Sequence, residues 1–273
     1  MLIVLVLGLV FGSFVNALVW RMHEQLTNKS KRFKPELSIV KGRSLCPSCK
    51  HQLSANDLWP VISWIALRGK CRYCKKPISW QYPLVELSTA ALFMLSYAVW
   101  PFSFSLLGYM TFVVWLIILV QLVALFVYDI KWMILPNRLV GLVVPFSGLL
   151  VVLHAFDVRS PGYVLSAVTG AAVIAGLFWA LFQISGGKWI GGGDVKLAVA
   201  LGLIAGSPVK ALLVIFIASL LGTVISLPFL IAKKRKLINK VAFGPYLITA
   251  TVIVFFWGSA MIHWYAEYVL MFN

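Results

Sequence analysis

The sequence predicts an all-α membrane protein, a polytopic bundle of about eight transmembrane helices with a small four-cysteine insertion on the cytoplasmic side. Hydrophobic residues make up 61% of the 273 residues and only 12% are charged, roughly half the charged fraction of soluble domains. The mean hydropathy is +0.94, and the apolar residues gather in runs that are long enough, or nearly so, to cross a bilayer. The four cysteines all lie in the one long polar stretch, between the first two runs.

Crossing the hydrocarbon takes about 20 apolar residues. Eight runs are candidate spans: residues 2–20, 83–100, 109–128, 139–155, 163–184, 195–206, 209–232 and 241–262. The first run has a basic residue after it, Arg21, and none before it, which is the wrong polarity for a cleaved signal peptide. We therefore expect it to be retained as a span. The run 195–206 is the weakest, because a helix of its length reaches only ~18 Å against a core of ~30 Å.

The basic residues predict the orientation of the chain. A net charge of +16 would suggest nucleic acid in a soluble protein, whereas in a membrane protein lysine and arginine mark the cytoplasmic side. With eight crossings and residues 21–81 in the cytoplasm, every basic residue except Arg159 and Lys210 lies on that side. If 195–206 did not cross, the basic run at 233–236 would lie outside. We therefore keep the crossing, interpret 233–236 as a stop-transfer anchor and expect no nucleic-acid partner.

The cysteines form two Cys-x2-Cys pairs, Cys46 with Cys49 and Cys71 with Cys74. This pattern is typical of a zinc ribbon in which four thiolates complete a tetrahedral, structural site. The alternative is two disulfides, which need an oxidising compartment, whereas this loop is predicted in the reducing cytosol. Zinc would also fold a module too small for a core of its own. We thus expect three parts: a first helix at 1–20, a zinc-binding insertion at 21–82 and a helix bundle at 83–273.

Two aspartates stand at the cytoplasmic ends of apolar runs. Asp194 follows three glycines at the start of one run, and Asp129 ends another. A carboxylate at the membrane boundary costs free energy, so it suggests function. Two nearby carboxyls that share a proton can serve as the acid and the base of peptide hydrolysis. The alternative is a structural pairing with Lys131 and Lys196, but residues two apart on a helix do not face each other.

The residues beside Asp194 are candidates for contact with a substrate. Gly191 and Gly193 would permit backbone conformations closed to other residues and the close approach of another chain. The alternatives are a glycine stripe for helix packing or a phosphate-binding loop, and the Gly-x-x-x-x-Gly-Lys-[Ser/Thr] pattern of such a loop is absent.

Taken together, these motifs resemble the type IV prepilin peptidase family, membrane aspartyl proteases with a Gly-x-Gly-Asp signature. The resemblance covers most of the chain and rests on residues 11–16 with Arg21, the four cysteines, residues 82–87, Asp129 with residues 135–137, residues 191–196 and residues 243–246. The chain departs from the commonest pattern at Met22-His23, where Arg-x-Pro is usual, at Ile190, where Phe often stands, and at Asn137, where Asp is frequent.

The resemblance implies a helix bundle in the bacterial inner membrane with its active site open to the cytoplasm. It implies that Asp129 and Asp194 cut the basic leader from type IV prepilins or pseudopilins, and that the new N-terminal amine is methylated by S-adenosylmethionine. Candidate residues for the substrate or methyl-donor site are Gly191, Gly193, Lys196, Glu86, Asn16 and Arg21. Glu86 could instead be a structural partner for Arg21 or a lysine. Because no Gly-rich Rossmann loop is present, the methyl transfer rests on the resemblance.

Two other classes of function remain open. A proton-coupled transporter would use Asp129 and Asp194 as relay carboxylates and would show activity without peptide cleavage. A zinc-ribbon membrane scaffold would recruit a partner and would tolerate substitution of both aspartates.

Overall fold

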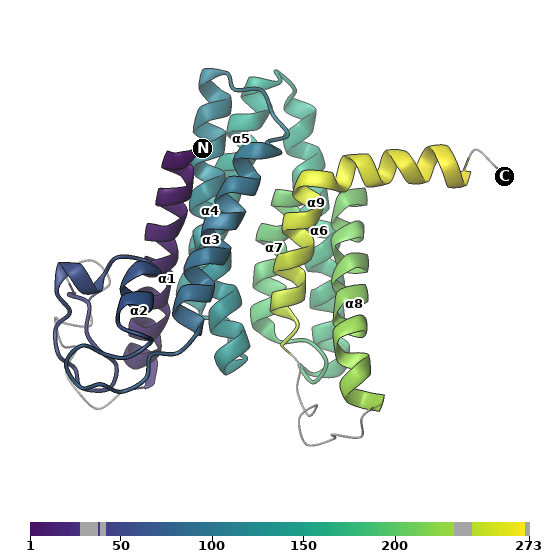
Figure 1. The fold of residues 1–273 in the computed structure, drawn as a ribbon. Helices are drawn as coiled ribbons and strands as arrows, with labels where there is room; N and C mark the ends of the chain where they lie inside the picture. Colours follow the sequence, from purple (N-terminus) through teal and green to yellow (C-terminus); the bar gives the residue numbers. More distant parts are fainter. Residues whose placement is uncertain (28–37, 39–41, 232–241, 271–273) are drawn as a thin grey trace. The chain divides into compact units, whose positions relative to one another are not determined.

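The computed structural model describes residues 1–27, 38, 42–231 and 242–270, and within these ranges it is helical with two isolated β-bridges. The basic run at 233–236, predicted as an anchor, lies outside the described residues. Contacts divide the chain into two compact units, Met1–Val99 and Trp100–Asn273. Figure 1 shows the helices of both units.

The first unit consists of two long helices and the insertion between them. Its elements are α1 (Leu2–Thr27), η2 (Ala55–Asp57), α2 (Ile62–Ala66) and α3 (Gln81–Ala98). Two glycines bring α1 against α3, since a Cβ at Gly8 would lie 2.5 Å from Ala90 Cα and one at Gly12 would lie 2.6 Å from Glu86 Cα. Glycines at this four-residue spacing let helix backbones approach closely in membranes.

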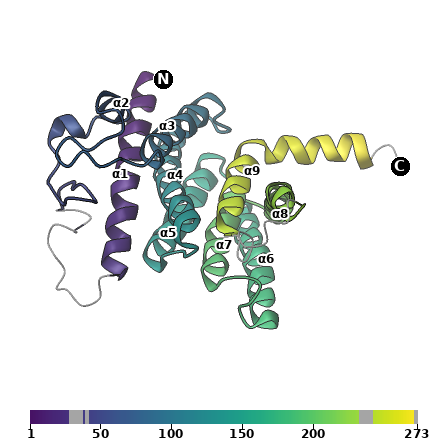
Figure 2. The ribbon, with the colours of Figure 1, turned by 60° about the horizontal axis from the view of Figure 1, so that its bottom comes forward.

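The second unit is a bundle of six helices within the described residues. They are α4 (Leu106–Trp132), α5 (Asn137–Asp157), α6 (Pro161–Ser185), α7 (Gly192–Ala205), α8 (Pro208–Ile231) and α9 (Gly244–Tyr265), and α9 continues into the π-helical turn η4 (Ala266–Leu270). Helix α7 packs against α5, α6, α8 and α9, and two views show α6 to α9 gathered together (Figures 1 and 2). Consequently Leu197, Ala200 and Leu201 of α7 are completely buried.

The separation of the sixth and seventh runs, 195–206 and 209–232, is confirmed. Gly206 ends α7 in the left-handed conformation with φ +76°, and Pro208 is the first residue of α8. Glycine tolerates the positive φ that ends a helix, and proline is favoured in a first turn because it lacks the N–H that would go unpaired there. Helices α7 and α8 are therefore separate elements.

Among the described residues, six helices are long and apolar enough to cross a membrane by length and composition. These candidate spans are Leu2–Thr27, Leu106–Trp132, Asn137–Asp157, Pro161–Ser185, Pro208–Pro228 and Gly244–Tyr268. The other two predicted spans are present as α3 and α7, with 18 and 14 residues. At 1.5 Å per residue, α7 reaches only ~21 Å against a core of ~30 Å. The all-α membrane architecture is confirmed, while the number of crossings and the cytoplasmic side stay predictions.

The predicted division at residues 20 and 82 also stays a prediction. The contacts group α3 with α1 and the insertion, not with the helices that follow. Gly8 and Gly12 of α1 give the physical reason, because they let the backbones of α1 and α3 approach closely.

Candidate active site and metal centre

Asp129 and Asp194 meet at the first residue of α9. Asp129 lies in the last turn of α4 with 5% of its surface exposed, and Asp194 lies in the first turn of α7 and is half-buried. A Cβ atom at Gly244 would lie 2.5 Å from Asp129 Oδ2 and 3.6 Å from Asp194 Oδ1. Because both distances start from the same point, the separation of Asp129 Oδ2 from Asp194 Oδ1 is at most their sum. The structure thus brings together two carboxylates that are remote in sequence.

Each carboxylate also receives a backbone hydrogen bond at the start of a helix. The backbone of Gly244, which opens α9, bonds Asp129, and the backbone of Gly191, the N-cap of α7, bonds Asp194. Helix N-termini favour negative charge because their first N–H groups have no partner within the helix. Charge on either aspartate is therefore partly compensated by backbone amides.

The neighbouring lysines have other partners. Lys196 Nζ donates to Asn137 Oδ1 at 2.9 Å, and the Lys131 ammonium lies 4.9 Å from the ring centre of Trp132. Among the described residues no ion pair joins either aspartate to a lysine. The described residues therefore do not form the ion pairs with Lys131 and Lys196 that the sequence left open as an alternative. Two like charges this close disfavour double ionisation, which leaves one proton to share.

Of the three glycines before Asp194, Gly193 allows close packing, and none of the three has an unusual backbone angle. Gly191 has φ −73°, and residues 191–193 are absent from the positions with positive φ. A Cβ at Gly193, however, would lie 2.9 Å from Leu135 Cβ. Gly193 therefore lets the loop after α4 pack onto the start of α7, which helps to bring Asp129 towards Asp194. The approach of a substrate strand to Gly191 and Gly193 stays a prediction.

Gly244 is a site residue to which the sequence pattern gave no role. Residues 243–246 entered the argument only as a motif, because nothing local in the sequence indicates that Gly244 faces Asp129. The available signal was a glycine followed by Pro245 at the start of an apolar run, which is typical of a helix beginning. The functional reason for a glycine there becomes visible only from the contact in space.

The four cysteines of the chain lie in one cluster. Their sulfur atoms are all within 4.8 Å of one another, and Cys46 Sγ lies 4.0 Å from Cys74 Sγ. Sulfurs around a tetrahedral metal with bonds of about 2.3 Å lie ~3.8 Å apart, so the cluster is of the right size to hold a metal ion. No disulfide forms among them. The predicted grouping is confirmed.

The two cysteine pairs repeat one backbone geometry. In the first, the amide of Lys50 donates to Cys46 O at 2.9 Å, and in the second the amide of Lys75 donates to Cys71 O at 3.0 Å. Both lysines have φ +59°, a conformation that is uncommon for residues other than glycine. The repeat indicates two equivalent ligand-bearing turns, closed by the bridges between residues 45 and 52 and between 70 and 77.

Backbone amides also favour the thiolate form at one ligand. Burial acts to raise the pKa of Cys71, but hydrogen bonds from the amides of Cys74 and Tyr73 and with the thiols of Cys46 and Cys74 outweigh it and lower the pKa to about 7. A metal ligand has to be a thiolate. The amides of this turn therefore stabilise the thiolate form of Cys71.

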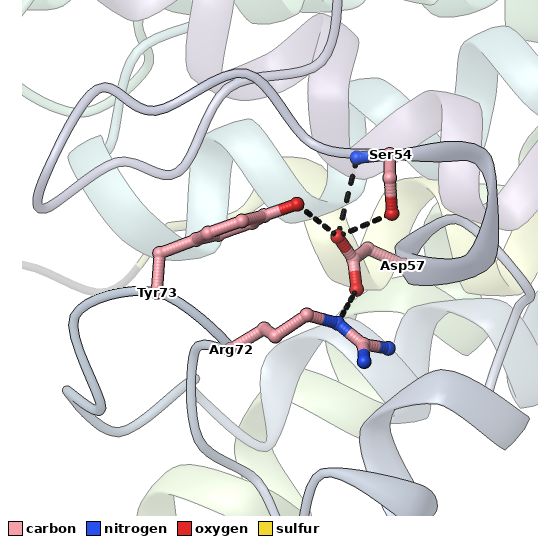
Figure 3. Close-up of polar contacts among 4 residues, drawn as sticks. All are labelled: Ser54, Asp57, Arg72 and Tyr73. Carbon is pink, nitrogen blue, oxygen red and sulfur yellow. Dashed lines mark hydrogen bonds and ion pairs between the residues drawn. The ribbon is translucent and has the colours of Figure 1, made fainter.

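Asp57 connects the second cysteine pair to the segment between the pairs (Figure 3). Arg72 Nε donates to Asp57 Oδ1 at 2.7 Å and Tyr73 Oη donates to Oδ2 at 3.1 Å, while Ser54 adds its amide and its hydroxyl. The Asp57 side chain is only 4% exposed. Burial acts to raise its pKa, but the hydrogen bonds from Arg72, Ser54 and Tyr73 outweigh burial and lower it. Arg72 and Tyr73 stand between Cys71 and Cys74, so this ionised carboxylate fixes the turn that carries the second cysteine pair.

We expect Asp57→Ala to weaken metal binding about tenfold, because residues that orient metal ligands contribute on this scale. Competition with a chromophoric chelator on the purified full-length chain measures the effect. Asn56→Ala is the matched control, since Asn56 is an exposed neighbour in η2. Equal affinities of the two variants would show that the contacts of Asp57 do not support the metal centre.

Glu86 has partners within the first unit. Its Oε2 accepts the amide of Val61 at 2.7 Å, and the Ser13 hydroxyl hydrogen-bonds the same carboxylate. Glu86 is 6% exposed. It therefore connects the insertion to the two long helices, and a part in the methyl-donor or substrate site stays a prediction.

The other two polar candidates of this unit are also engaged. Asn16 Nδ2 donates to Tyr82 O at 3.1 Å, and Gln81 Nε2 donates to Asn16 Oδ1 at 3.3 Å. Arg21 donates to Ser38 O at 3.1 Å. These contacts support a positioning role at the entry to α3 and the exit of α1, and a role in substrate binding stays a prediction.

Comparison with known proteins agrees with this geometry. The Bacterial Peptidase A24 N-terminal domain matches residues 6–100, and the Type IV leader peptidase family matches residues 110–227. The second match contains both Asp129 and Asp194. No solved structure matches the chain.

The curated relatives match over nearly their whole length. A prepilin leader peptidase/N-methyltransferase of Aeromonas hydrophila is 34% identical over 96% of this chain and 92% of the relative. One of Xanthomonas campestris is also 34% identical, over 96% and 93%, and one of Pseudomonas aeruginosa is 30% identical, over 97% and 92%. With two carboxylates meeting at Gly244 and a four-cysteine cluster before them, the chain belongs to the type IV leader peptidase family.

Proposed function

We propose that the chain is a prepilin leader peptidase that cuts the basic leader from type IV prepilins or pseudopilins, with Asp129 and Asp194 as the catalytic pair. The observation that carries this proposal is the convergence of the two carboxylates on Gly244. The names of the relatives give the substrate class.

The chemistry follows from one proton shared by two carboxyls. The ionised carboxylate takes a proton from water, and the resulting hydroxide attacks the scissile carbonyl. The protonated carboxyl gives its proton to the departing amine. After the step the two carboxyls have exchanged protonation states. A proton transfer from one to the other restores the starting pair. The assignment of base and acid belongs to the pair as a whole.

The second part of the proposal is methylation of the new N-terminal amine. The relatives carry N-methyltransferase in their names, which implies S-adenosylmethionine, a sulfonium compound that supplies an electrophilic methyl group. Of the polar candidates, Glu86, Asn16 and Lys196 already have partners in the chain. They remain the candidate residues for the methyl-donor or substrate site, together with Gly191, Gly193 and Arg21. The amine that accepts the methyl exists only after cleavage, which sets the order of the two reactions.

We further propose that the four cysteines hold a structural zinc ion. Four protein thiolates complete a tetrahedral zinc site and leave no position for a substrate or water. The zinc centre would therefore stabilise the insertion and take no part in the hydrolysis.

The cytoplasmic side of the bacterial inner membrane is the proposed location of both centres. It is supported by the sorting of the basic residues and by the six candidate spans. The proposed partners are a prepilin precursor and the lipid bilayer.

The proposal is tested by incubating the purified full-length chain with a prepilin-like peptide, with and without S-adenosylmethionine, and following the products by mass spectrometry. We expect cleavage after the basic leader in both cases and methylated product only with the methyl donor and only on cleaved peptide. An intact, folded chain that transports protons but does not cut the peptide would favour the transporter instead.

We expect Gly244→Ala to lower cleavage about 100-fold, since a displacement of a catalytic group by about 1 Å has effects of this size. The added methyl would lie 2.5 Å from Asp129 Oδ2, so the carboxylate has to move. Gly148→Ala is the matched control, because its added methyl meets nothing within 4 Å. Equal turnover of the two variants would show that Gly244 does not set the geometry of the pair.

A further inference from the structure

Residues 58–65, from the end of η2 through α2, carry four large apolar side chains that point away from the protein. The exposed fractions are 42% for Leu58, 61% for Trp59, 63% for Ile62 and 62% for Ile65. Ile62 and Ile65, three residues apart, lie on one side of α2, and Leu58 and Trp59 lie in the segment just before it. We call these four residues the α2 apolar face. Adjoining exposed apolar side chains of this size are typical of a surface that meets another surface.

The opposite side of α2 is packed. The Trp64 ring lies 4.2 Å from the Trp80 ring, centre to centre, and its Nε1 donates to Ile78 O at 3.3 Å. Trp64 also covers Gly69, where a Cβ would lie 2.9 Å from its ring. The segment is therefore a formed element with an inner and an outer side, so the exposure of the α2 apolar face does not come from a frayed loop.

A buried carboxylate ties this segment to α3. The amide of Val61 donates to Glu86 Oε2 at 2.7 Å, and both views draw α2 beside α1 (Figures 1 and 2). Val61 has φ +59°, which is strained for a β-branched residue. The charged hydrogen bond offsets part of that strain. The start of α2 is thus held at a defined level along α3.

The position on α3 to which Val61 is tied lies within the helix and not beyond its end. Glu86 is the sixth residue of α3, about 8 Å along its axis. Its neighbours Leu84 and Leu87 are 60% and 51% exposed, as expected of side chains that face lipid. Val61 at the start of α2 therefore lies level with the first apolar turns of α3, which would lie at the boundary of a bilayer that α3 spans.

The basic charge of the insertion also favours contact with a lipid surface. Residues 42–80 contain seven lysines and arginines and one carboxylate, Asp57, which Arg72 already pairs. Basic segments next to membrane helices are attracted to anionic lipid headgroups. Exposed tryptophans such as Trp59 and Trp80 also favour the headgroup level. Charge and apolar content together indicate a lipid surface as the occupant, ahead of a protein.

We propose that the α2 apolar face is a membrane-surface anchor, inserted into the headgroup region of the leaflet at which α3 begins and held at that depth by Glu86. The anchor goes beyond the peptidase activity. It gives the cysteine module a fixed position on the bilayer, as amphipathic elements do when apolar area and basic charge act together.

The test uses the full-length chain in vesicles of phosphatidylethanolamine and phosphatidylglycerol, with a diazirine-bearing residue in place of Ile62 or Ile65. After irradiation, adducts are identified by mass spectrometry. The same label at Asn56, an exposed polar site of the insertion, is the matched control, and a label at Leu84 reports lipid on α3. We expect about tenfold more lipid adduct at positions 62 and 65 than at 56.

Two results would overturn the anchor. One is a lipid yield at positions 62 and 65 no higher than at 56 while Leu84 gives its adduct. The other is cross-linking from 62 and 65 to residues 100–273 or to a second copy of the chain, which would mean that protein covers this face.

A second pair of variants tests the part of Glu86. With the label at 62, Glu86→Leu should lower the lipid adduct several-fold because Val61 loses its acceptor, whereas Glu86→Gln keeps a side-chain oxygen and should keep the adduct. Zinc content near one per chain verifies that the insertion is folded in each variant. An unchanged adduct in Glu86→Leu with zinc retained would rule out the tether.

Discussion

Asp129→Asn and Asp194→Asn should each lower cleavage of a prepilin-like peptide by about 1000-fold or more, since acid and base groups contribute on this scale and one remaining carboxyl cannot do both tasks. Asparagine keeps the size of the side chain and so leaves the contacts at Gly244 largely intact. The measurement is turnover of full-length precursor by the purified variants, followed by mass spectrometry.

Asp157→Asn is the matched control for these variants. Asp157 ends α5 and accepts hydrogen bonds from Ser103 and Ser105, and asparagine retains an acceptor oxygen there. This variant should cut the precursor at the wild-type rate. Near wild-type turnover in either Asp129→Asn or Asp194→Asn would exclude the proposed mechanism.

A peptide that already lacks its leader separates loss of chemistry from loss of fold. Its free amine can accept a methyl group without cleavage, so both asparagine variants should still methylate it with S-adenosylmethionine present. Methylated product from full-length precursor with Asp194→Asn would contradict the order of reactions. Loss of methylation on the precut peptide would point to a disturbed fold.

The pairing of Asp129 with Asp194 could be predicted from the sequence because carboxylates at the ends of apolar runs stand out against their surroundings. Asp194 follows three glycines, and Asp129 closes an otherwise apolar run. The cysteine pairs are equally distinct, because their spacing follows from the geometry of a tetrahedral site. In each case the residue type and its immediate neighbours contained the signal.

The contacts that support these centres could not be predicted in the same way. Gly244 faces Asp129, Asp57 holds Arg72 and Glu86 binds the amide of Val61. Each of these pairs is distant in sequence, and its effect depends on a backbone direction that local pattern does not contain. The packing of α3 on α1 had a local signal in Gly8 and Gly12, which indicates a close helix contact but not the partner.

The metal centre gives the second large expected effect. Cys46→Ser and Cys71→Ser should each remove the metal and unfold the insertion, because a structural zinc contributes about 10–16 kcal/mol to folding in small zinc modules. Both cysteines are buried, at 6% and 4% exposure, and serine offers no thiolate in their place. Zinc is measured by mass spectrometry of the purified chain, with about one ion per chain expected before substitution.

Hydrogen exchange then shows where the structure is lost. Residues 42–80 should lose protection in both serine variants, while α4 to α7 should keep theirs, since they belong to a separate compact unit. Ser48→Ala is the matched control, because Ser48 is exposed between Cys46 and Cys49 and is not a ligand. A serine variant that retained both its zinc and its protection would contradict the four-thiolate site, and disulfides found in native membranes would replace it with an oxidised module.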